Sequence, residues 1–185
     1  MTRAEDALRA ELEERLHFEA LLADLAIHAL DVVFADRPAP PHVRVKVFSH
    51  LLGESDTTFF AAGPLATKLR RRFPRSLNDA ALLLPTPGSA HRADLDQWFE
   101  KEDLHPRVIA EFDDSALMKT FGQGGGAVFP APTVIAREVA RQYGVHPIGR
   151  VTALRERYYV VSAERRLKHP AVLALTTAAR HELFG

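Results

Sequence analysis

The sequence contains no cysteine, no excess of either charge and no long apolar run, and each absence excludes a class of protein. Without cysteine among 185 residues, the chain can form no disulfide, no thiolate zinc site and no cysteine nucleophile. Lys and Arg total 24, and Asp and Glu also total 24, whereas a free-standing nucleic-acid-binding protein usually carries a basic excess. No stretch approaches the roughly 18 consecutive apolar residues of a membrane span.

The composition that remains is typical of a globular chain. Hydrophobic residues make up 46% and charged residues 26%, and the length suits one ordinary domain or two small lobes. The first six residues include two acidic side chains and no apolar segment, so we expect no signal peptide and a cytoplasmic protein. The nine histidines show no HExxH spacing, which argues against a zinc enzyme.

Hydrophobic patterning predicts a first helix followed by alternating strands and helices. Leucines recur every four residues at the start, which predicts a helix over residues 1–30. Strands are predicted at Leu30–Ala35, Val43–Val47, Thr57–Ala62, Leu82–Leu84, Val108–Phe112, Ala127–Phe129, His146–Thr152 and Arg157–Ser162. Further helices are predicted at Leu65–Phe73, Ala90–Glu102, Ser115–Gln123, Val134–Tyr143 and Pro170–Phe184. This alternation favours an α/β fold with a parallel sheet, and the run Leu30–Ala35, which does not alternate, predicts a strand buried on both faces.

Prolines and glycines predict where these elements end. Pro130 and Pro132 are expected to break the strand that ends at Phe129. Thr133 is expected to cap the next helix and Gly144 to stop it. The three glycines at 124–126 follow a helix and lack the Lys-Ser/Thr pair of a phosphate loop, so they predict a tight turn.

Polar residues follow three of the predicted strands. In a parallel α/β sheet, ligands bind at the carboxyl ends of strands and often at helix N-termini. Asp36 follows one strand, Pro85–Ser89 a second and Phe112–Ser115 a third. The loop at Pro85–Ser89 is either a site for an anionic or polar ligand or a capped connection to the next helix. Asp113 and Asp114 either face a ligand or cap the helix that follows them.

The stretches Glu111–Lys119, Phe121-Gly122 and Val128–Thr133 resemble the effector-binding domain of LysR-type transcriptional regulators. Supporting stretches are Leu21–Leu25, Leu30–Val33, Gly53-Glu54, Phe59-Phe60, Tyr143–Val145, Ile148–Arg150, Ala163–Arg166 and His169–Val172. They extend over nearly the whole chain in the family's order. Within the family, the chain is most similar to the NhaR-like branch of sodium/proton antiporter regulators.

The resemblance implies two Rossmann-like α/β lobes, as in periplasmic binding proteins, with an effector in the cleft between them. Lobe I would comprise residues 1–57 and 150–185, and lobe II residues 58–149. The first lobe is expected to be incomplete at its N-terminus, because the sequence holds neither the family's winged helix-turn-helix and linker helix nor the first strand. The family pattern makes Leu8–Leu12 a strand, whereas its Ala, Glu, Leu and Arg residues favour helix. Both interpretations stay open.

The resemblance also implies where the effector binds. By family position, Thr86, Pro87 and Ser89 are the best ligand candidates. The other candidates lie at strand ends or beside the predicted cleft: Asp36, Phe112, Asp113, Asp114, Ser115, Phe129 and Pro130. The carboxylates of Asp36, Asp113 and Asp114 suit a hard cation such as sodium, an idea that the NhaR resemblance motivates. No cofactor is expected.

An enzyme and a basic binding surface are the competing interpretations. Ser89 and His91, with Asp94 or Asp96, supply the residue types of a catalytic triad. No GxSxG elbow is present, and residues of one helix do not easily form a triad, so we expect no catalysis. The basic run Lys68–Arg75 is expected to be a solvated helix face rather than a contact for nucleic acid.

The sequence therefore predicts an effector-sensing regulatory domain of a LysR-type regulator. Its expected partners are a small-molecule or ion effector and an oligomer, formed with identical chains or with a full-length regulator. Family members of this kind form dimers through this domain. We expect no DNA binding by this chain alone and no membrane association. The alternative is a ligand-free interaction protein, or a dominant-negative partner of a full-length regulator.

Overall fold

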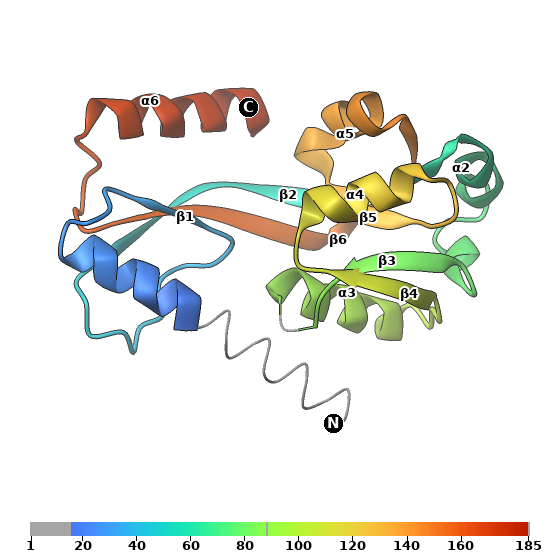
Figure 1. The fold of residues 1–185 in the computed structure, drawn as a ribbon, viewed down its shortest axis with the longest axis horizontal. Helices are drawn as coiled ribbons and strands as arrows, with labels where there is room; N and C mark the ends of the chain where they lie inside the picture. The colour runs from blue at the N-terminus through green and yellow to red at the C-terminus, as the bar shows by residue number, and fades with distance from the viewer. Residues whose placement is uncertain (1–15, 88, 185) are drawn as a thin grey trace. The chain divides into compact units, whose positions relative to one another are not determined.

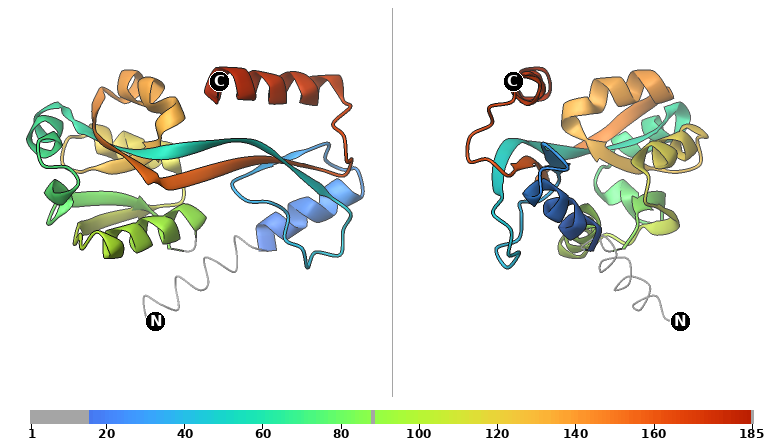
Figure 2. Two further views of the ribbon diagram at one scale, coloured as in Figure 1. Left: turned by 180° about the vertical axis from the view of Figure 1, so that it is seen from behind. Right: turned by 60° about the vertical axis from the view of Figure 1, so that its left-hand side comes forward.

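The fold contains two long strands, β2 (Phe48–Ala62) and β6 (Val145–Ser162) (Figures 1 and 2). The computed structural model describes residues 16–87 and 89–184. β2 and β6 are neighbours in a four-stranded sheet of order β1-β6-β2-β5, which also contains β1 (Val33–Ala35) and β5 (Phe129–Pro132). The predicted strand or helix at Leu8–Leu12, and with it the predicted incomplete start of lobe I, lies outside the described residues.

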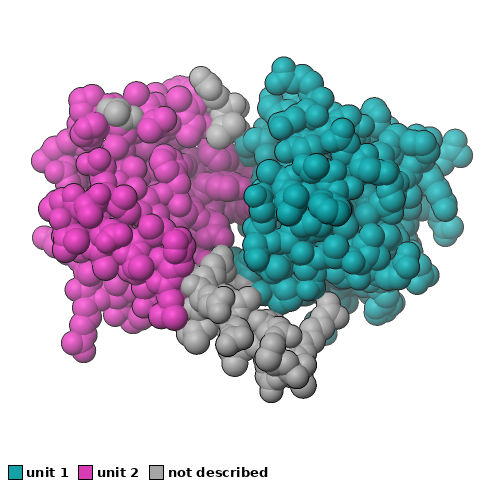
Figure 3. Space-filling view, viewed as in Figure 1, with its two compact units in different colours: residues 1–11, 56–155 teal, residues 12–55, 156–185 magenta. Residues whose placement is uncertain are grey.

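The chain divides into two compact units (Figure 3). Both long strands contribute residues to each unit. Among the described residues, unit 1 comprises 56–155, and unit 2 comprises 16–55 and 156–184. The predicted lobe boundaries at residues 57 and 150 stay a prediction. Both units mix helices and strands, so the predicted α/β class is confirmed.

The remaining elements follow the predicted alternation closely. In unit 1 they are α2 (Gly63–Arg70), η1 (Arg75–Leu77), β3 (Ala81–Pro85), α3 (Ala90–Lys101), β4 (Arg107–Phe112), α4 (Ser115–Gln123), η2 (Thr133–Ile135) and α5 (Ala136–Tyr143). In unit 2 a helix covers residues 16–26, and α6 (Pro170–Ala178) and η3 (Ala179–Leu183) follow β6. None of the helices in the described ranges is long and apolar enough to cross a membrane.

β3 occupies the middle of unit 1. It pairs in parallel with β4, and on its other side Leu82 forms a parallel bridge with Val128. The amide of Leu83 donates to the Val128 carbonyl at 2.8 Å, and the amide of Val128 donates to the Ala81 carbonyl at 2.9 Å. The run Leu82–Leu84 is buried throughout, which is typical of a central parallel strand, because such a strand is covered on both faces.

The core of unit 1 consists of two clusters that use consecutive residues of β2. Successive side chains of a strand point to opposite faces of the sheet. Phe59 therefore packs in one cluster with Trp98 and other residues of α3, while Phe60 packs in a second cluster with Phe129. The ring centroids of Phe59 and Trp98 lie 5.6 Å apart, and those of Phe60 and Phe129 lie 5.8 Å apart. The first cluster contains residues of α3, and the second contains residues of α4 and α5. Helices therefore cover both faces of the sheet.

The first predicted strand is shorter and differently paired in the structure. Only Val33–Ala35 forms a strand, and it pairs antiparallel with β6. Phe34 is 54% exposed, so the prediction of a parallel strand buried on both faces is wrong. The sequence shows an apolar run but does not show that one face of this edge strand has no covering element.

The predicted strand at Val43–Val47 is also wrong, although its alternation is real. The described backbone there is irregular, and Val43, Val45 and Val47 are partly buried against the cluster of Phe18, Leu22, Leu25, Val33 and Val161. Alternation places the valines on the core, but a strand also needs a neighbour to bond its backbone.

Two further predictions about strand ends are corrected. Pro130 does not break the strand at Phe129, because β5 continues through Pro130 to Pro132, and Pro130 pairs with Phe59 of β2. Proline is tolerated because β5 lies at the end of the four-stranded order, where one side of a strand needs no N–H donor. The two strands predicted at 146–152 and 157–162 form one continuous β6.

The start of helix α5 differs from the prediction, and its end agrees with it. Thr133 does not cap it; a short 3₁₀ turn precedes the helix, and the Thr133 hydroxyl instead contacts the Thr58 hydroxyl at 2.8 Å. Gly144 stops the helix in the left-handed conformation, with φ of 62°. That stop is confirmed, because glycine alone adopts this conformation without steric cost.

The contact between α4 and β5 yields a test of the core. A methyl group at Gly122 would overlap the ring of Phe129, which is fully buried. We expect Gly122→Ala to lower the free energy of unfolding by about 1 to 2 kcal/mol, even after its gain in helix propensity, because overpacking forces the core to shift. Urea unfolding followed by circular dichroism measures this.

Gly126→Ala is the matched control, because no heavy atom lies within 4 Å of a methyl group placed there. Its unfolding free energy should stay within about 0.5 kcal/mol of the parent chain. Equal stability of the two variants would contradict the packing of Gly122 on Phe129.

Candidate functional site

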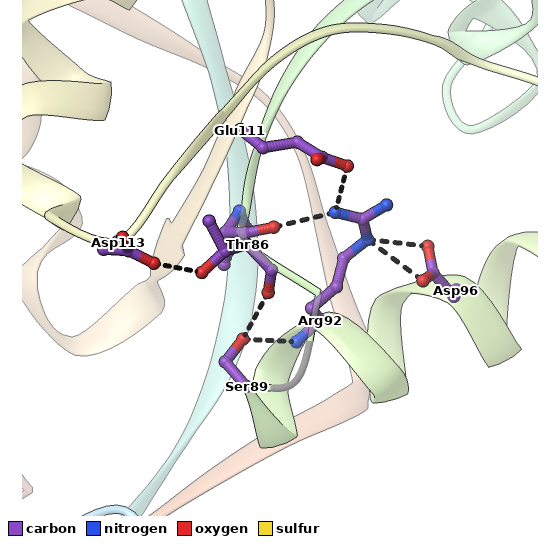
Figure 4. A network of polar contacts seen from close by, with 7 residues as sticks. Thr86, Ser89, Arg92, Asp96, Glu111 and Asp113 are labelled. Carbon is purple, nitrogen blue, oxygen red and sulfur yellow. Dashed lines mark hydrogen bonds and ion pairs between the residues drawn. The ribbon is translucent and has the colours of Figure 1, made fainter. Parts of the chain in front are cut away.

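The parallel pairing of β3 and β4 brings two predicted strand ends together. Pro85 pairs with Phe112 at the end of the ladder, and the amide of Thr86 donates to the Phe112 carbonyl at 3.1 Å. The Thr86 hydroxyl donates to Oδ1 of Asp113 at 2.5 Å (Figure 4). Thr86 and Asp113 are 27 residues apart in sequence, and the sheet places them in contact.

Each of these strands leads into a helix that begins with a side-chain cap. Oγ of Ser89 accepts a hydrogen bond from the amide of Arg92 at 3.2 Å and donates to the Thr86 carbonyl at 3.4 Å. Oδ1 of Asp114 accepts the amides of Ala116 at 2.6 Å and Leu117 at 3.2 Å. The two aspartates therefore have different roles, because Asp114 caps α4 while Asp113 holds Thr86. Two helix N-termini and a Thr–Asp pair thus lie at one edge of the sheet.

Arg92 bonds to groups at both strand ends, and it is not among the candidates that the sequence predicts. Its side chain is only 6% exposed. Nη1 donates to the Pro85 carbonyl at 2.8 Å and to Oε1 of Glu111 at 2.9 Å, and Nε donates to Asp96 at 2.9 Å. Burial disfavours the charged guanidinium, but the hydrogen bonds and charges of Asp96 and Glu111 outweigh it, so the pKa of Arg92 is raised. The spacing of Arg92 and Asp96, four residues on one helix, was the available signal.

Two other candidates of unit 1 make polar or aromatic contacts. The half-buried ring of Phe112 faces Phe121, with centroids 5.3 Å apart. Oγ of Ser115 accepts a hydrogen bond from Nζ of Lys119 at 3.1 Å, and Lys119 is only 8% exposed. Lys119 therefore adds a nearly buried cation beside the first turn of α4, again unpredicted.

The remaining candidates lie apart from this polar group. Phe129 is fully buried in a core cluster of unit 1, and Pro130 is also buried. Pro87 is half-buried in the loop before α3. Asp36 belongs to unit 2 and pairs with its neighbour Arg37 at 3.3 Å. The effector contacts predicted for these residues stay predictions.

Within the described part of the chain, no group of three or more His, Asp or Glu residues is placed to hold a metal ion. Asp36 belongs to unit 2, whereas Asp113 and Asp114 belong to unit 1. The expectation that these three carboxylates coordinate a hard cation stays a prediction. Ser89 and Asp96, considered above as parts of a triad, instead cap α3 and bind Arg92.

Comparison with known families identifies this class of domain. Residues 5–183 match the profile of the LysR substrate binding domain. The chain therefore belongs to the LysR substrate-binding domain family, which is a family of transcriptional regulator domains and not of enzymes.

Among proteins of known role, the chain is similar to the transcriptional activator protein NhaR of Escherichia coli. The two are 36% identical over 167 residues, which is 90% of this chain and 54% of NhaR. The chain thus spans about half the length of this relative.

Solved structures confirm the fold. The effector-binding domain of QuiR, solved in complex with shikimate, superposes with a TM-score of 0.61 at 14% identity, covering 90% of this chain and 78% of that one. Full-length CbnR, solved with its target DNA, gives a TM-score of 0.62 at 16% identity, covering 87% of this chain and 55% of that one. The predicted fold of two α/β lobes, as in periplasmic binding proteins, is the fold of this family.

Removing the guanidinium of Arg92 tests whether it holds the site together. We expect Arg92→Ala to lower the free energy of unfolding by about 2 kcal/mol, because the Pro85 carbonyl and the Glu111 carboxylate each lose a charged donor. Arg92→Lys should recover only part of this loss, since an ammonium cannot reproduce the planar fork. Urea unfolding measures both variants.

Arg107→Ala is the control, because Arg107 is an exposed residue on β4. It should change the unfolding free energy by no more than about 0.5 kcal/mol. If Arg92→Ala were as stable as this control, Arg92 would not organise the strand ends.

Proposed function

We propose that this chain is the effector-sensing domain of a LysR-type regulator and binds a small ligand or ion at the ends of β3 and β4. One observation carries the proposal: the Thr86–Asp113 pair lies at an edge of the sheet where two capped helices begin. Helix N-termini favour anionic and polar groups. The hydroxyls of Thr86, Ser89 and Ser115 can exchange their present partners for a ligand.

The relatives support a small polar effector and an NhaR-like role. QuiR binds shikimate in a domain of the same fold, and NhaR is an activator of transcription. We propose that the effector here is a small carboxylate or an ion such as sodium, and that the chain acts in the cytoplasm without catalysis. Ion binding would use Asp113 with hydroxyl and carbonyl oxygens, which are the ligands that hard cations prefer.

The signal would leave the domain through oligomerisation. An effector changes an assembly only by binding one arrangement better than another. Unit 2 offers a surface for such assembly, because Phe34 on the edge strand β1 is 54% exposed and Ile27 is 74% exposed, and edge strands readily pair with another chain. We propose assembly with identical chains or with a full-length regulator, and no DNA binding by this chain alone.

The same surface favours a second candidate function. The exposed apolar residues around β1 could hold a full-length regulator in an inactive mixed oligomer without any ligand. In that case the polar group at Thr86 would serve only to connect β3 and β4 to their helices. The two candidates differ in whether a ligand binds.

Effector binding is tested by calorimetry and thermal shift with sodium chloride, choline chloride, shikimate and acetate as probes. We expect at least one of them to bind and to raise the melting temperature. Thr86→Val should weaken that binding by about tenfold, because one hydrogen bond to a charged partner is lost. Thr67→Val is the matched control, since Thr67 is an exposed residue of α2 whose hydroxyl donates to the Gly63 carbonyl of the same helix.

The outcome that favours the second candidate is equally clear. No stabilisation by any of these probes, together with stable dimers in sedimentation velocity, would sink the sensor proposal. Equal weakening by Thr86→Val and Thr67→Val would place the ligand elsewhere.

DNA binding is tested with a labelled duplex at physiological salt. Because positive and negative side chains balance at 24 each, we expect no retention of the duplex in an electrophoretic shift assay at micromolar protein concentration. Retention that falls steeply with added salt would contradict the proposal. A duplex held by the basic run Lys68–Arg75 would be released by Arg71→Glu, which makes the source of any binding identifiable.

A further inference from the structure

Unit 2 contains a pocket that the proposed function does not use. Its volume is about 300 Å³. Its walls are the turn at 28–32 after the first helix, the segment 162–169 after β6 and the first turn of α6. Pockets that hold small ligands start at about this size and combine an apolar wall with a few polar groups.

Two of the residues that line the pocket are buried, and hydrogen bonds fix one of them in place. Ser162 is 2% exposed and Val172 is 6% exposed. The Ser162 hydroxyl donates to the Glu164 carbonyl at 2.7 Å, and it lies 3.2 Å from Nε2 of His50. These bonds fix the segment that follows β6, so the pocket has a defined shape on that side.

His28 reaches the rim of the pocket from an unusual backbone position. It lies in the turn after the first helix, which ends at residue 26, and has φ of 58°. Its amide donates to the Leu25 carbonyl at 3.1 Å. Glycine normally fills such a position, because other side chains adopt this conformation at a steric cost. An imidazole kept there lines the pocket, and strained residues of this kind cluster at ligand sites.

Opposite charges share the rim without neutralising each other. Asp31, Glu164 and Lys168 all line the pocket. Neither Asp31 nor Lys168 forms an ion pair within residues 16–87 and 89–184. The pocket thus offers a separated acceptor and donor, with Val172 and Leu167 as the apolar wall.

We propose that this pocket binds a small neutral α-amino acid in its zwitterionic form. The carboxylate of the ligand would accept from Lys168 and from the imidazole of His28, and its ammonium group would donate to Asp31. A ligand of a single charge sign would leave either the Lys168 ammonium or the carboxylates of Asp31 and Glu164 unmatched. An aliphatic side chain would lie against Val172 and Leu167. This binding is separate from the effector site of unit 1.

The test is titration calorimetry of the full chain with L-alanine and L-leucine, compared with acetate and ethylammonium as the two halves of the ligand. We expect an amino acid to bind at least about tenfold more tightly than either half. Lys168→Met and Asp31→Asn should each weaken amino-acid binding by about tenfold. Lys101→Met and Asp94→Asn, exposed residues of α3, should leave it unchanged.

Three outcomes would overturn the proposal. They are no binding of either amino acid up to about 10 mM, amino-acid binding that Lys168→Met and Asp31→Asn leave unchanged, and acetate binding that is as tight as amino-acid binding and is weakened by Lys168→Met. Circular dichroism of each variant shows that it is folded. If the unit 1 probes failed to bind while an amino acid bound through Asp31 and Lys168, the proposed effector site would fail and this pocket would stand.

Discussion

The parallel pairing of β3 and β4 is the constraint on which the candidate site depends. Parallel neighbours end at the same edge of a sheet, so the chain must start a new helix there after each strand. Thr86 and Asp113 meet only because of this pairing. Arg92 holds these two strand ends and α3 together, because its buried guanidinium donates to a carbonyl at the end of β3, a carboxylate of β4 and a carboxylate of α3.

A second set of charges holds the long strands β2 and β6 together. Arg157 donates from Nε to Oε1 of Glu54 at 2.7 Å, and Arg150 donates to Oδ2 of Asp56. The hydrogen bond and charge of Glu54 raise the pKa of Arg157. These cross-strand pairs lie on either side of the boundary between residues 55 and 56, where β2 passes from unit 2 to unit 1. They favour one register for strands whose alternation alone would tolerate slippage.

Local chemistry predicted the elements of unit 1 well and those of unit 2 less well. The buried run Leu82–Leu84, the capping role of Asp114 and the stop at Gly144 follow from side-chain pattern and backbone sterics, which act over a few residues. The strand predicted at Val43–Val47 failed because alternation reports which side chains are buried and not whether a neighbouring strand bonds the backbone. The prolines of β5 were misjudged for the same reason, since only the sheet order shows that a strand lies at an edge.

The sequence by itself determined the family, the α/β class and the strand ends where polar residues gather, because these depend on residue order and short-range spacing. Only the tertiary structure decided which of those residues act together. It joined Thr86 to Asp113, buried Phe129 in the core and placed Arg92 and Lys119 beside the site. It also brought Asp31 and Lys168 to one pocket across 137 residues of sequence. Such contacts depend on which strands pair and in which direction, and hydrogen bonds between distant segments, rather than local propensity, set that choice.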